Sequence, residues 1–374
     1  MNNSSLEIMT TSSPTLLPSS GGLVTNRSLP ETVIYGILLG VLIVLTILGN
    51  VMVLASFVLE KRLRILVNYP IISLALGDLL LGLLVLPFSA LLTATQHFPF
   101  GAIWCNIYIS FDVMLCKASI WNVTAISVDR YIAVTWPLRY RQHISHKKVF
   151  AVLLAIWFVA AITAFVPIYM GWNTADGLVQ NLGQAEAPSC HLAVENLAYS
   201  VTLSLTDFII PLILLLFTYV QVLVIARRQA QLIQTPRIAF NSHANGPELP
   251  TLNTKELRAT IMLSAVIATF LLCWILYMVT FIIKPFIPHL DNDLDLTALW
   301  LGYLNSTANP FVYAVAHPKF RRTFMRILCP KWLCKCAKHQ RNSDSPDSNF
   351  NAQNARLCGP ETSMIDVACI SFQS

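Results

Sequence analysis

Charged side chains interrupt otherwise apolar segments of this chain, and their chemistry needs an explanation. The stretch SFDVMLCKASIWNVTAISVDRY, residues 110–131, contains Asp112, Lys117, Asp129 and Arg130. A carboxylate in a low-dielectric cleft attracts a cation, and a guanidinium forms strong, directional ion pairs with carboxylates. We therefore expect these side chains to bind charged groups or to switch between partners.

The elements that must position these charges are long apolar helices. The chain of 374 residues is 55% hydrophobic and only 12% charged, which excludes an ordinary soluble domain and indicates a protein of the lipid bilayer. About 20 mostly apolar residues form a helix that crosses the hydrocarbon core. Seven blocks of this kind occur, at residues 33–58, 69–94, 103–135, 149–171, 197–226, 257–284 and 294–316. We predict an all-α membrane protein with a seven-helix transmembrane domain over 33–316, because lipid tolerates no unpaired backbone and the blocks lack the alternation of barrel strands.

Lysine and arginine are unevenly distributed over the connections between the blocks. The connections after the first, third and fifth blocks carry clusters of Lys and Arg, whereas the connections 95–101, 172–196 and 285–293 carry almost none. Basic connections face the cytoplasm. The distribution predicts a multi-pass protein of the plasma membrane with an extracellular N-terminus.

The two ends of the chain differ from the blocks in composition. The polar N-terminal tail, 1–32, has acceptor sequons for glycosylation at Asn2, Asn3 and Asn26. The segment 317–329 alternates basic and apolar residues and is predicted to be a short amphipathic helix on the cytoplasmic membrane surface. The tail 330–374 is rich in Ser and Asn and is predicted to be disordered.

The cysteines fall on two sides of the predicted membrane. Cys105 and Cys190 are the pair on the oxidising side, which predicts a disulfide between them. Cys329, Cys334 and Cys336 follow the amphipathic segment on the cytoplasmic side, where palmitoylation is expected.

Helical rise separates the charges of the third block by depth. Asp112 and Arg130 are 18 residues apart, or about 27 Å along a helix at 1.5 Å per residue. Asp112 is thus placed to meet a ligand from outside, and Asp129 and Arg130 to meet partners inside. One helix that reaches both surfaces suits a signal transducer.

The remaining charges within blocks follow the same reasoning. An Asp at the centre of a membrane helix costs about 2.5–3.5 kcal/mol on insertion scales, so it faces the bundle interior and is a functional candidate. Asp78, in the second block, and Asp207, in the fifth, are such residues.

Short motifs accompany these charges in all seven blocks. They are LGNVMVL at Asn50, LALGDLLL at Asp78, Asp129-Arg130-Tyr131, Trp157, Pro211 with Tyr219, FLLCW with Phe270 and Trp274, and Asn309-Pro310 with Tyr313. Together they resemble rhodopsin-like (class A) G-protein-coupled receptors. Within that family, ISFDVMLCKAS and WLGYLNSTANPFVY are similar to the biogenic-amine receptors, and GWN with IARRQAQLI is most similar to type-2 histamine receptors.

The resemblance implies a receptor rather than an enzyme. Its expected partners are a small cationic amine outside, with a histamine-like ligand favoured, and a heterotrimeric G protein inside, with the cyclase-stimulating class favoured. Arrestin and a receptor kinase are further expected partners, with Ser343, Ser345 and Ser348 as candidate phosphorylation sites. No nucleic acid, catalytic residue, metal centre or cofactor is expected, apart from a Na+ ion near Asp78.

The resemblance also assigns a ligand site. Asp112 is similar to the aspartate that binds the ligand ammonium, and aromatic faces around it would add cation–π attraction. In the alternative interpretation Asp112 is a structural acid bonded to Tyr303. The candidate ligand-binding residues are Asp112, Val113, Cys116, Ser204, Asp207, Trp274, Tyr277, Trp300 and Tyr303.

Three further sets of residues follow from the resemblance. The candidate activation switch and G-protein contact comprises Asp129, Arg130, Tyr131, Tyr219, Glu256, Asn309, Pro310 and Tyr313, with Glu256 as the partner of Arg130. The candidate connector between pocket and switch comprises Pro211, Ile120 and Phe270. The candidate sodium site comprises Asp78, Ser119, Asn305 and Asn309, for which a hydrated pocket without specific sodium is the alternative.

The sequence departs from the family at three places. Lys117 and Asp207 stand where amine receptors typically have threonine and a serine or threonine, and we predict that they form a buried ion pair, because each charge alone would be costly. If Asp207 is instead free, a diamine held by Asp112 and Asp207 is the alternative ligand. Leu276 replaces the usual proline of the sixth block, so the kink of that helix and the basal activity are expected to differ. A receptor with constitutive, ligand-independent activity is a separate alternative.

Overall fold

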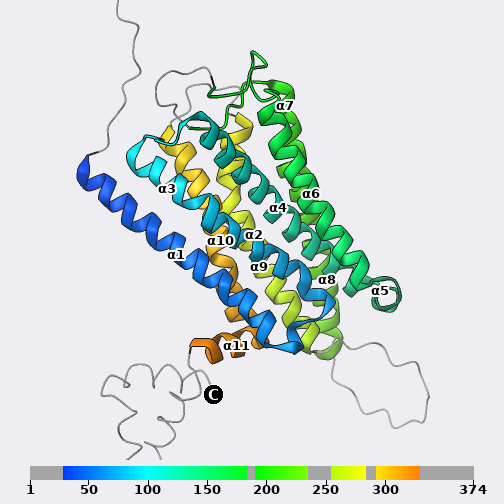
Figure 1. Cartoon of the computed structure of the whole chain (residues 1–374). Helices are drawn as coiled ribbons and strands as arrows, with labels where there is room; N and C mark the ends of the chain where they lie inside the picture. The colour runs from blue at the N-terminus through cyan, green and yellow to red at the C-terminus, as the bar shows by residue number, and fades with distance from the viewer. Residues whose placement is uncertain (1–27, 183–189, 235–253, 284–291, 329–374) are drawn as a thin grey trace, which may run out of the picture.

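The computed structural model describes residues 28–182, 190–234, 254–283 and 292–328, and its elements are helical (Figure 1). The α-helices are α1 (Leu29–Leu59), α2 (Tyr69–Leu84), α3 (Leu86–Thr95), α4 (Gly101–Thr135), α5 (Pro137–His143), α6 (His146–Tyr169), α7 (Leu197–Leu203), α8 (Ile210–Gln234), α9 (Thr254–Ile283), α10 (Asn292–Ala316) and α11 (Pro318–Leu328). Two 3-10 turns, Lys61–Leu63 and Leu66–Asn68, lie between α1 and α2. The predicted all-helical bundle is confirmed.

Two of the predicted membrane helices are interrupted next to a proline. Val85 separates α2 from α3, two residues before Pro87, which cannot donate to the Leu83 carbonyl. A π-helical turn, Ser204–Ile209, joins α7 to α8 just before Pro211, which likewise cannot donate to the Asp207 carbonyl. Each pair of helices still follows one path through the bundle (Figure 1).

Six helical segments among the described residues are long and apolar enough to cross a membrane. Their cores are Leu29–Leu59, Leu66–Leu84, Gly101–Thr135, His146–Tyr169, Leu197–Ile225 and Ala265–Ile283. The seventh helix, α10, is more polar but is 25 residues long and packs between α1 and α9. Its amides Asn305 and Asn309 are each 1% exposed, so its polar residues face the bundle interior rather than lipid.

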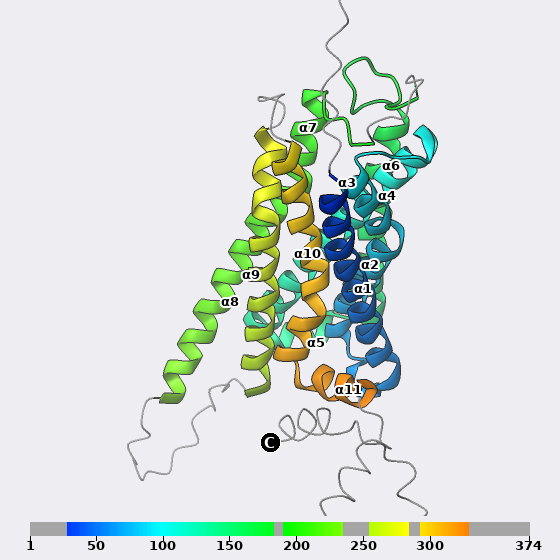
Figure 2. The ribbon, with the colours of Figure 1, turned by 90° about the vertical axis from the view of Figure 1, so that its left-hand side faces the viewer.

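The long helix α4 occupies the middle of the bundle. It packs against α2, α6, α8 and α9, while α1 packs against α2, α3 and α10. Figure 2 shows α11 lying across one end of the bundle. In α11, Phe320 and Phe324 are buried against the bundle and Arg321 and Arg322 are exposed, as expected for an amphipathic helix at a membrane surface.

Polar side chains connect neighbouring helices in the bundle interior. The Asn50 amide donates to the Ser306 carbonyl at 3.1 Å, which joins α1 to α10, and the Trp157 indole donates to Ser73 Oγ at 3.0 Å, which joins α6 to α2. Lipid provides no hydrophobic force between helices, so close packing and such bonds hold them together. We call the end of the bundle at Cys105 the disulfide end and the opposite end the Arg130 end.

Candidate functional site

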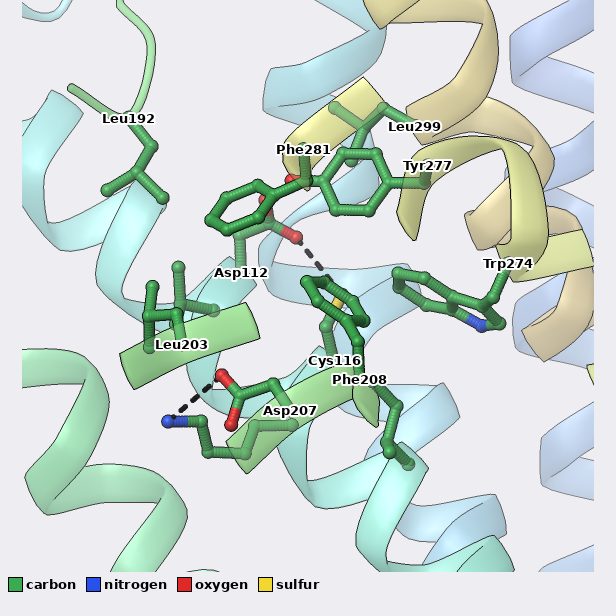
Figure 3. Close-up of a pocket in the computed structure, with 13 residues that line it drawn as sticks. Asp112, Cys116, Leu192, Leu203, Asp207, Phe208, Trp274, Tyr277, Phe281 and Leu299 are labelled. Atoms are coloured by element: carbon green, nitrogen blue, oxygen red, sulfur yellow. Dashed lines mark hydrogen bonds and ion pairs between the residues drawn. The ribbon is translucent and has the colours of Figure 1, made fainter. Parts of the chain in front are cut away.

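A pocket lies among α4, the π-helical turn, α9 and α10 (Figure 3). Its empty volume is about 460 Å³, including the part open to solvent. The lining residues are Asp112, Val113, Cys116, Lys117, Ile120, Leu192, Leu203, Asp207, Phe208, Trp274, Tyr277, Phe281 and Leu299. A mostly apolar hollow with a few convergent polar groups is the usual form of a small-molecule site.

Asp112 is held from two sides at the pocket wall. The Tyr303 hydroxyl donates to Asp112 Oδ1 at 2.9 Å, and the Cys116 thiol donates to the same oxygen at 3.5 Å. The aspartate lines the pocket and keeps partial exposure. The bond to Tyr303 therefore orients the carboxylate without removing it from the cavity.

Lys117 and Asp207 form an ion pair in the pocket lining, and Figure 3 shows Asp207 on the side of the pocket away from Tyr277 and Leu299. Lys117 Nζ lies 3.2 Å from Asp207 Oδ2, the pairing that the sequence predicts. Two hydroxyls complete the cluster, since Lys117 Nζ also donates to Thr163 Oγ1 at 2.7 Å and Thr206 Oγ1 donates to Asp207 Oδ1 at 2.9 Å. The side chains of the lysine and aspartate are 4% and 10% exposed, so this is a buried ion pair with added hydrogen bonds.

An aromatic wall faces these polar groups. Phe208 packs against Phe281 and Tyr277 with ring centroids 5.4 and 6.1 Å apart, and Tyr277 packs edge-on against Trp274 at 5.7 Å. Edge-to-face pairs at such distances are the favoured aromatic arrangement. The wall can accept a flat aromatic group or the face of an organic cation.

Three residues that the sequence assigned to the ligand do not line this pocket. Trp300 is turned toward α3, where its indole donates to Thr93 Oγ1 at 2.9 Å. Tyr303 is fully buried behind Asp112, and Ser204 is buried at the start of the π-helical turn. These three residues lie outside the lining of this pocket, and their assignment to the ligand stays a prediction.

The sequence also missed lining residues. Phe208 directly follows Asp207, and Phe281 lies one helical turn beyond Tyr277. Both positions could have been predicted to line the pocket from their spacing to residues already assigned to it. Thr163, which supports Lys117, is the hydroxyl residue of the apolar run 151–168 and was likewise detectable. Leu192, Leu203 and Leu299 carry no such signal.

A buried amide network holds the connection between α6 and α7 over the pocket. The disulfide between Cys105 and Cys190 ties this connection to α4. Next to it, Asn106 Nδ2 donates to the Gln180 carbonyl at 2.9 Å, and Gln180 Oε1 accepts from Asn173 Nδ2 at 2.6 Å and from the Ala193 backbone at 2.9 Å. The network places the neighbouring Leu192 in the pocket wall.

Two of the candidate sodium residues bond to Asp78, which is fully buried. Ser119 Oγ donates to Asp78 Oδ1 at 3.0 Å, and Asn309 Nδ2 donates to Oδ2 at 2.8 Å. Asn305 is buried in α10, four residues before Asn309, and the side-chain oxygens of both residues are buried without a hydrogen-bond donor. Unpartnered oxygens beside a carboxylate match the ligands of a hard cation.

The candidate switch lies at the Arg130 end. Arg130 pairs with the adjacent Asp129 at 2.7 Å, and the Tyr140 hydroxyl of α5 donates to the same carboxylate at 2.8 Å. Burial, and then Asp129, raise the pKa of Tyr140, which keeps it a proton donor. Glu256 lies in the first turn of α9, but its side chain is outside the described part of the chain, so the predicted contact with Arg130 stays a prediction.

The other predicted switch residues lie on α4, α8 and α10. The Tyr131 ring contacts Phe217 at 5.6 Å, while Tyr219 is partly buried against the main core. Tyr313 is fully buried near Phe320, and Pro310 lies within α10.

The candidate connector joins pocket and core. Ile120 lines the pocket and belongs with Phe270 to one buried cluster, and Phe270 stacks on Trp274 at 6.2 Å. Pro211, also buried, begins α8 beside the π-helical turn. A displacement of Ile120 or Trp274 in the pocket lining would therefore be passed to the buried core through direct side-chain contacts.

Several predicted modification sites lie outside the described residues. They are Asn2, Asn3, Asn26, Cys329, Cys334, Cys336 and the serines after residue 340. Their assignments stay predictions.

Comparison with known proteins places the chain among receptors. Residues 49–313 match the family model described as 7 transmembrane receptor (rhodopsin family). The chain is 38% identical to the histamine H2 receptor of Canis lupus familiaris over 322 residues, which cover 86% of this chain and 85% of that protein. It is 37% identical to the human histamine H2 receptor, with 84% and 83% covered, and 34% identical to the human 5-hydroxytryptamine receptor 4, with 80% of each chain covered.

Proposed function

The chain belongs to the rhodopsin family of seven-transmembrane receptors, and we propose that it binds a small cationic amine at the disulfide end and activates a heterotrimeric G protein at the Arg130 end. It is a G-protein-coupled receptor of the aminergic type and a multi-pass plasma-membrane protein, not an enzyme. We propose further that the disulfide end faces the outside of the cell. The cystine at that end and the excess of basic residues at the other support this orientation.

The position of Asp112 carries the ligand proposal. Its carboxylate lines a hollow whose other walls are aromatic or aliphatic, apart from the paired charges at Lys117 and Asp207. A protonated amine gains Coulomb attraction there, and Tyr277 and Trp274 offer ring faces to its organic part. Tyr303 holds the carboxylate in place for that contact.

The ligand favoured within the amine class is histamine-like. A catechol would need hydroxyl partners on the fifth helix, but Leu203 lines the pocket and Ser204 does not. A neutral imidazole offers one donor and one acceptor. These complement the carboxylate of Asp207 and the ammonium of Lys117 at the far part of the pocket.

The proposed transducer is a G protein of the cyclase-stimulating class. The similarity to histamine H2 receptors over 84% or more of the chain supports this choice. At the Arg130 end, Arg130 and Tyr140 both bind Asp129. A partner that displaces Arg130 from Asp129 would make its guanidinium available for contact, and one that displaces Tyr140 would make its hydroxyl available. Arrestin and a receptor kinase are further proposed partners.

A panel of amines applied to cells that express this chain tests the proposal. Cyclic AMP and calcium are read for histamine, tyramine, dopamine, serotonin and cadaverine, on the parent chain and on Asp112→Asn. The active amine should lose at least about a hundredfold in potency on Asp112→Asn, since breaking one partner of a buried pair costs about 3–5 kcal/mol and each 1.4 kcal/mol is tenfold. An unchanged potency at equal surface expression would contradict the proposal, as would silence of the parent chain toward every amine.

We also propose that Na+ binds beside Asp78. The Asp78 carboxylate, Ser119 Oγ and the unpartnered oxygens of Asn305 and Asn309 are hard oxygen donors of the kind this ion takes. Na+ should raise the thermal stability of the purified receptor relative to N-methyl-D-glucamine at equal ionic strength, and Asp78→Asn should abolish the difference. Equal stability of the parent chain in both salts would indicate a hydrated pocket instead.

A further inference from the structure

The pocket contains two acids but a net charge of minus one. Among its lining residues the charged ones are Asp112, Asp207 and Lys117. Lys117 pairs with Asp207 at 3.2 Å, while the bonds of Asp112 to Tyr303 and Cys116 come from neutral groups. Within the part of the chain that the structure describes, Asp207 thus has a cationic partner, and the hydrogen bonds of Asp112 to Tyr303 and Cys116 come from neutral groups alone.

The Lys117 ammonium is fixed by more than its ion pair. Thr163 on α6 accepts a hydrogen bond from it at 2.7 Å, and its side chain is 4% exposed. Asp207 is fixed in turn by the hydroxyl of Thr206. The pair is therefore anchored on both partners, yet both residues still line the cavity.

We propose that Lys117 determines the charge class of the ligand, because it occupies the second anionic position of the pocket and so restricts the site to monocationic amines. This inference rests on the proposed amine-receptor function and specifies which amines the site accepts. It also replaces the diamine alternative, which requires Asp207 to be free. Lys117 acts as an internal cation where a second ligand ammonium would otherwise bind.

Helical spacing supports this role. Lys117 is five residues beyond Asp112 on α4, about 7.5 Å deeper along the helix axis and about 140° around it, and both side chains still reach the same cavity. A flexible diamine with about five carbons between its nitrogens spans a distance of this order, at about 1.3 Å per bond. Its second ammonium would meet the cation of Lys117, and like charges brought together at a binding site strongly disfavour that ligand.

A purely structural ion pair would behave differently. Such a pair stabilises the bundle or restricts its conformation, and its removal changes expression without a preference for any ligand. Here the removal of Lys117 would leave the Asp207 carboxylate in the pocket lining, where a ligand cation can replace the lost ammonium. The structure thus predicts a gain of binding, which loss of stability cannot imitate.

Binding of cadaverine and of 1-aminopentane to the purified full-length receptor tests the inference. The two probes have the same carbon chain and differ by the second ammonium. Both are measured by thermal stabilisation over a concentration series, on the parent chain, Lys117→Thr and Lys117→Met. We expect each variant to raise the preference for cadaverine over 1-aminopentane at least tenfold. Lys117→Met keeps the apolar stem and so covers the case in which the shorter threonine prevents folding.

Three further variants locate the effect. Lys117→Arg keeps the cation and should keep the parent preference. The double change Lys117→Thr with Asp207→Ser removes both charges and should show no gain for cadaverine. Asp295→Asn, combined with Lys117→Thr, should leave the gain intact, because Asp295 does not line the pocket.

The inference is overturned if neither Lys117→Thr nor Lys117→Met raises the preference for cadaverine over 1-aminopentane. It is overturned as well if the gain for cadaverine persists when Asp207→Ser is added to Lys117→Thr, or if the gain is lost when Asp295→Asn is added. It is also overturned if the parent chain already binds cadaverine tighter than 1-aminopentane. Failure of the proposed function has a different signature, since then neither probe would stabilise the parent chain and Asp112→Asn would change nothing.

Discussion

Two aspartates of the pocket have the same carboxyl group and different environments. Asp112 accepts hydrogen bonds from Tyr303 and Cys116, which are neutral, whereas Asp207 is paired with the ammonium of Lys117. A neutral donor orients a carboxylate but leaves its charge uncompensated, and a cation at contact distance compensates it. Asp112 is therefore the group with attraction left for a ligand, and the neighbours rather than the residue type decide this.

Trp300 shows how one hydrogen bond changes the role of an aromatic residue. Its bond to Thr93 joins α10 to α3, so we expect it to stabilise the bundle rather than to contact the ligand. Trp300→Phe should lower the free energy of unfolding by about 0.5–1.5 kcal/mol from the lost bond, plus a contribution from the smaller ring. Amine affinity should stay close to that of the parent chain, as read by thermal stabilisation with the active amine.

Thr93→Val is the matched partner in this test. The double variant with Trp300→Phe should be less destabilised than the two single changes added together, because both remove the same bond. A fully additive result, or a large loss of amine affinity in Trp300→Phe at retained stability, would assign Trp300 to the ligand instead.

At the scale of elements, regular helices supply most of the pocket lining, and two irregular segments add Asp207, Phe208 and Leu192 to it. The π-helical turn Ser204–Ile209 presents Asp207 and Phe208 to the cavity. The connection between α6 and α7 contributes Leu192 and is held by the disulfide and by the buried amide of Gln180. π-helical turns are frequent at functional sites, because the extra residue changes the direction of the following side chains.

Gly171, in the connection after α6, provides a prediction at this scale. Its φ is +67°, and a Cβ there would lie 2.7 Å from the Gly177 carbonyl carbon and 2.8 Å from that of Leu178, both rigid backbone atoms. Gly171→Ala should therefore displace the connection, lower thermal stability and speed the dissociation of a bound amine. Radioligand dissociation and thermal unfolding of the purified receptor measure the two effects.

Gly177→Ala is the control for backbone strain. Gly177 has a similar φ of +71°, but a Cβ there would meet nothing within 4 Å. Gly177→Ala should lower the free energy of unfolding by about 1–2 kcal/mol, because alanine disfavours the left-handed backbone conformation. Equal effects of the two substitutions would show that the contact between Gly171 and the backbone at 177–178 is unimportant.

At the scale of the whole molecule, the first and seventh long helices close the bundle. α1 packs against α10, and Asn50 and Thr46 bond to Ser306 and Thr307 across that interface. These buried hydrogen bonds connect α1, the first of the long helices, to α10, the last of them. The packing of α1 on α10 also supports the helix that carries Tyr303, whose hydroxyl donates to Asp112.

Gly49 allows this closure. A Cβ at Gly49 would lie 2.9 Å from Pro310 Cγ, whereas a Cβ at Gly40 on the same helix would meet nothing within 4 Å. Gly49→Ala should destabilise the receptor by about 1–3 kcal/mol, because it overpacks a rigid ring. Gly40→Ala should be neutral or stabilise it by up to about 1 kcal/mol, because alanine is the better helix former. Thermal unfolding compares them, and equal stability of the two variants would contradict the proposed tight contact.

The sequence alone determined the parts of this protein that depend on residues near each other in the chain. Runs of apolar residues predict the membrane helices, since each must satisfy its own backbone in lipid. The motifs in those runs predicted the receptor family, and their charges predicted where function lies. The proposed pairing of Lys117 with Asp207 also followed from the sequence, because a buried charge requires a partner.

Only the tertiary structure decided what depends on the spacing between helices. It brings Thr163 of α6 to Lys117, turns Trp300 away from the pocket and places Leu192 in its wall. These outcomes depend on distances of a few ångströms set by a π-helical turn, by loop anchoring and by side-chain packing. Hydrophobic periodicity along one helix contains no information about them.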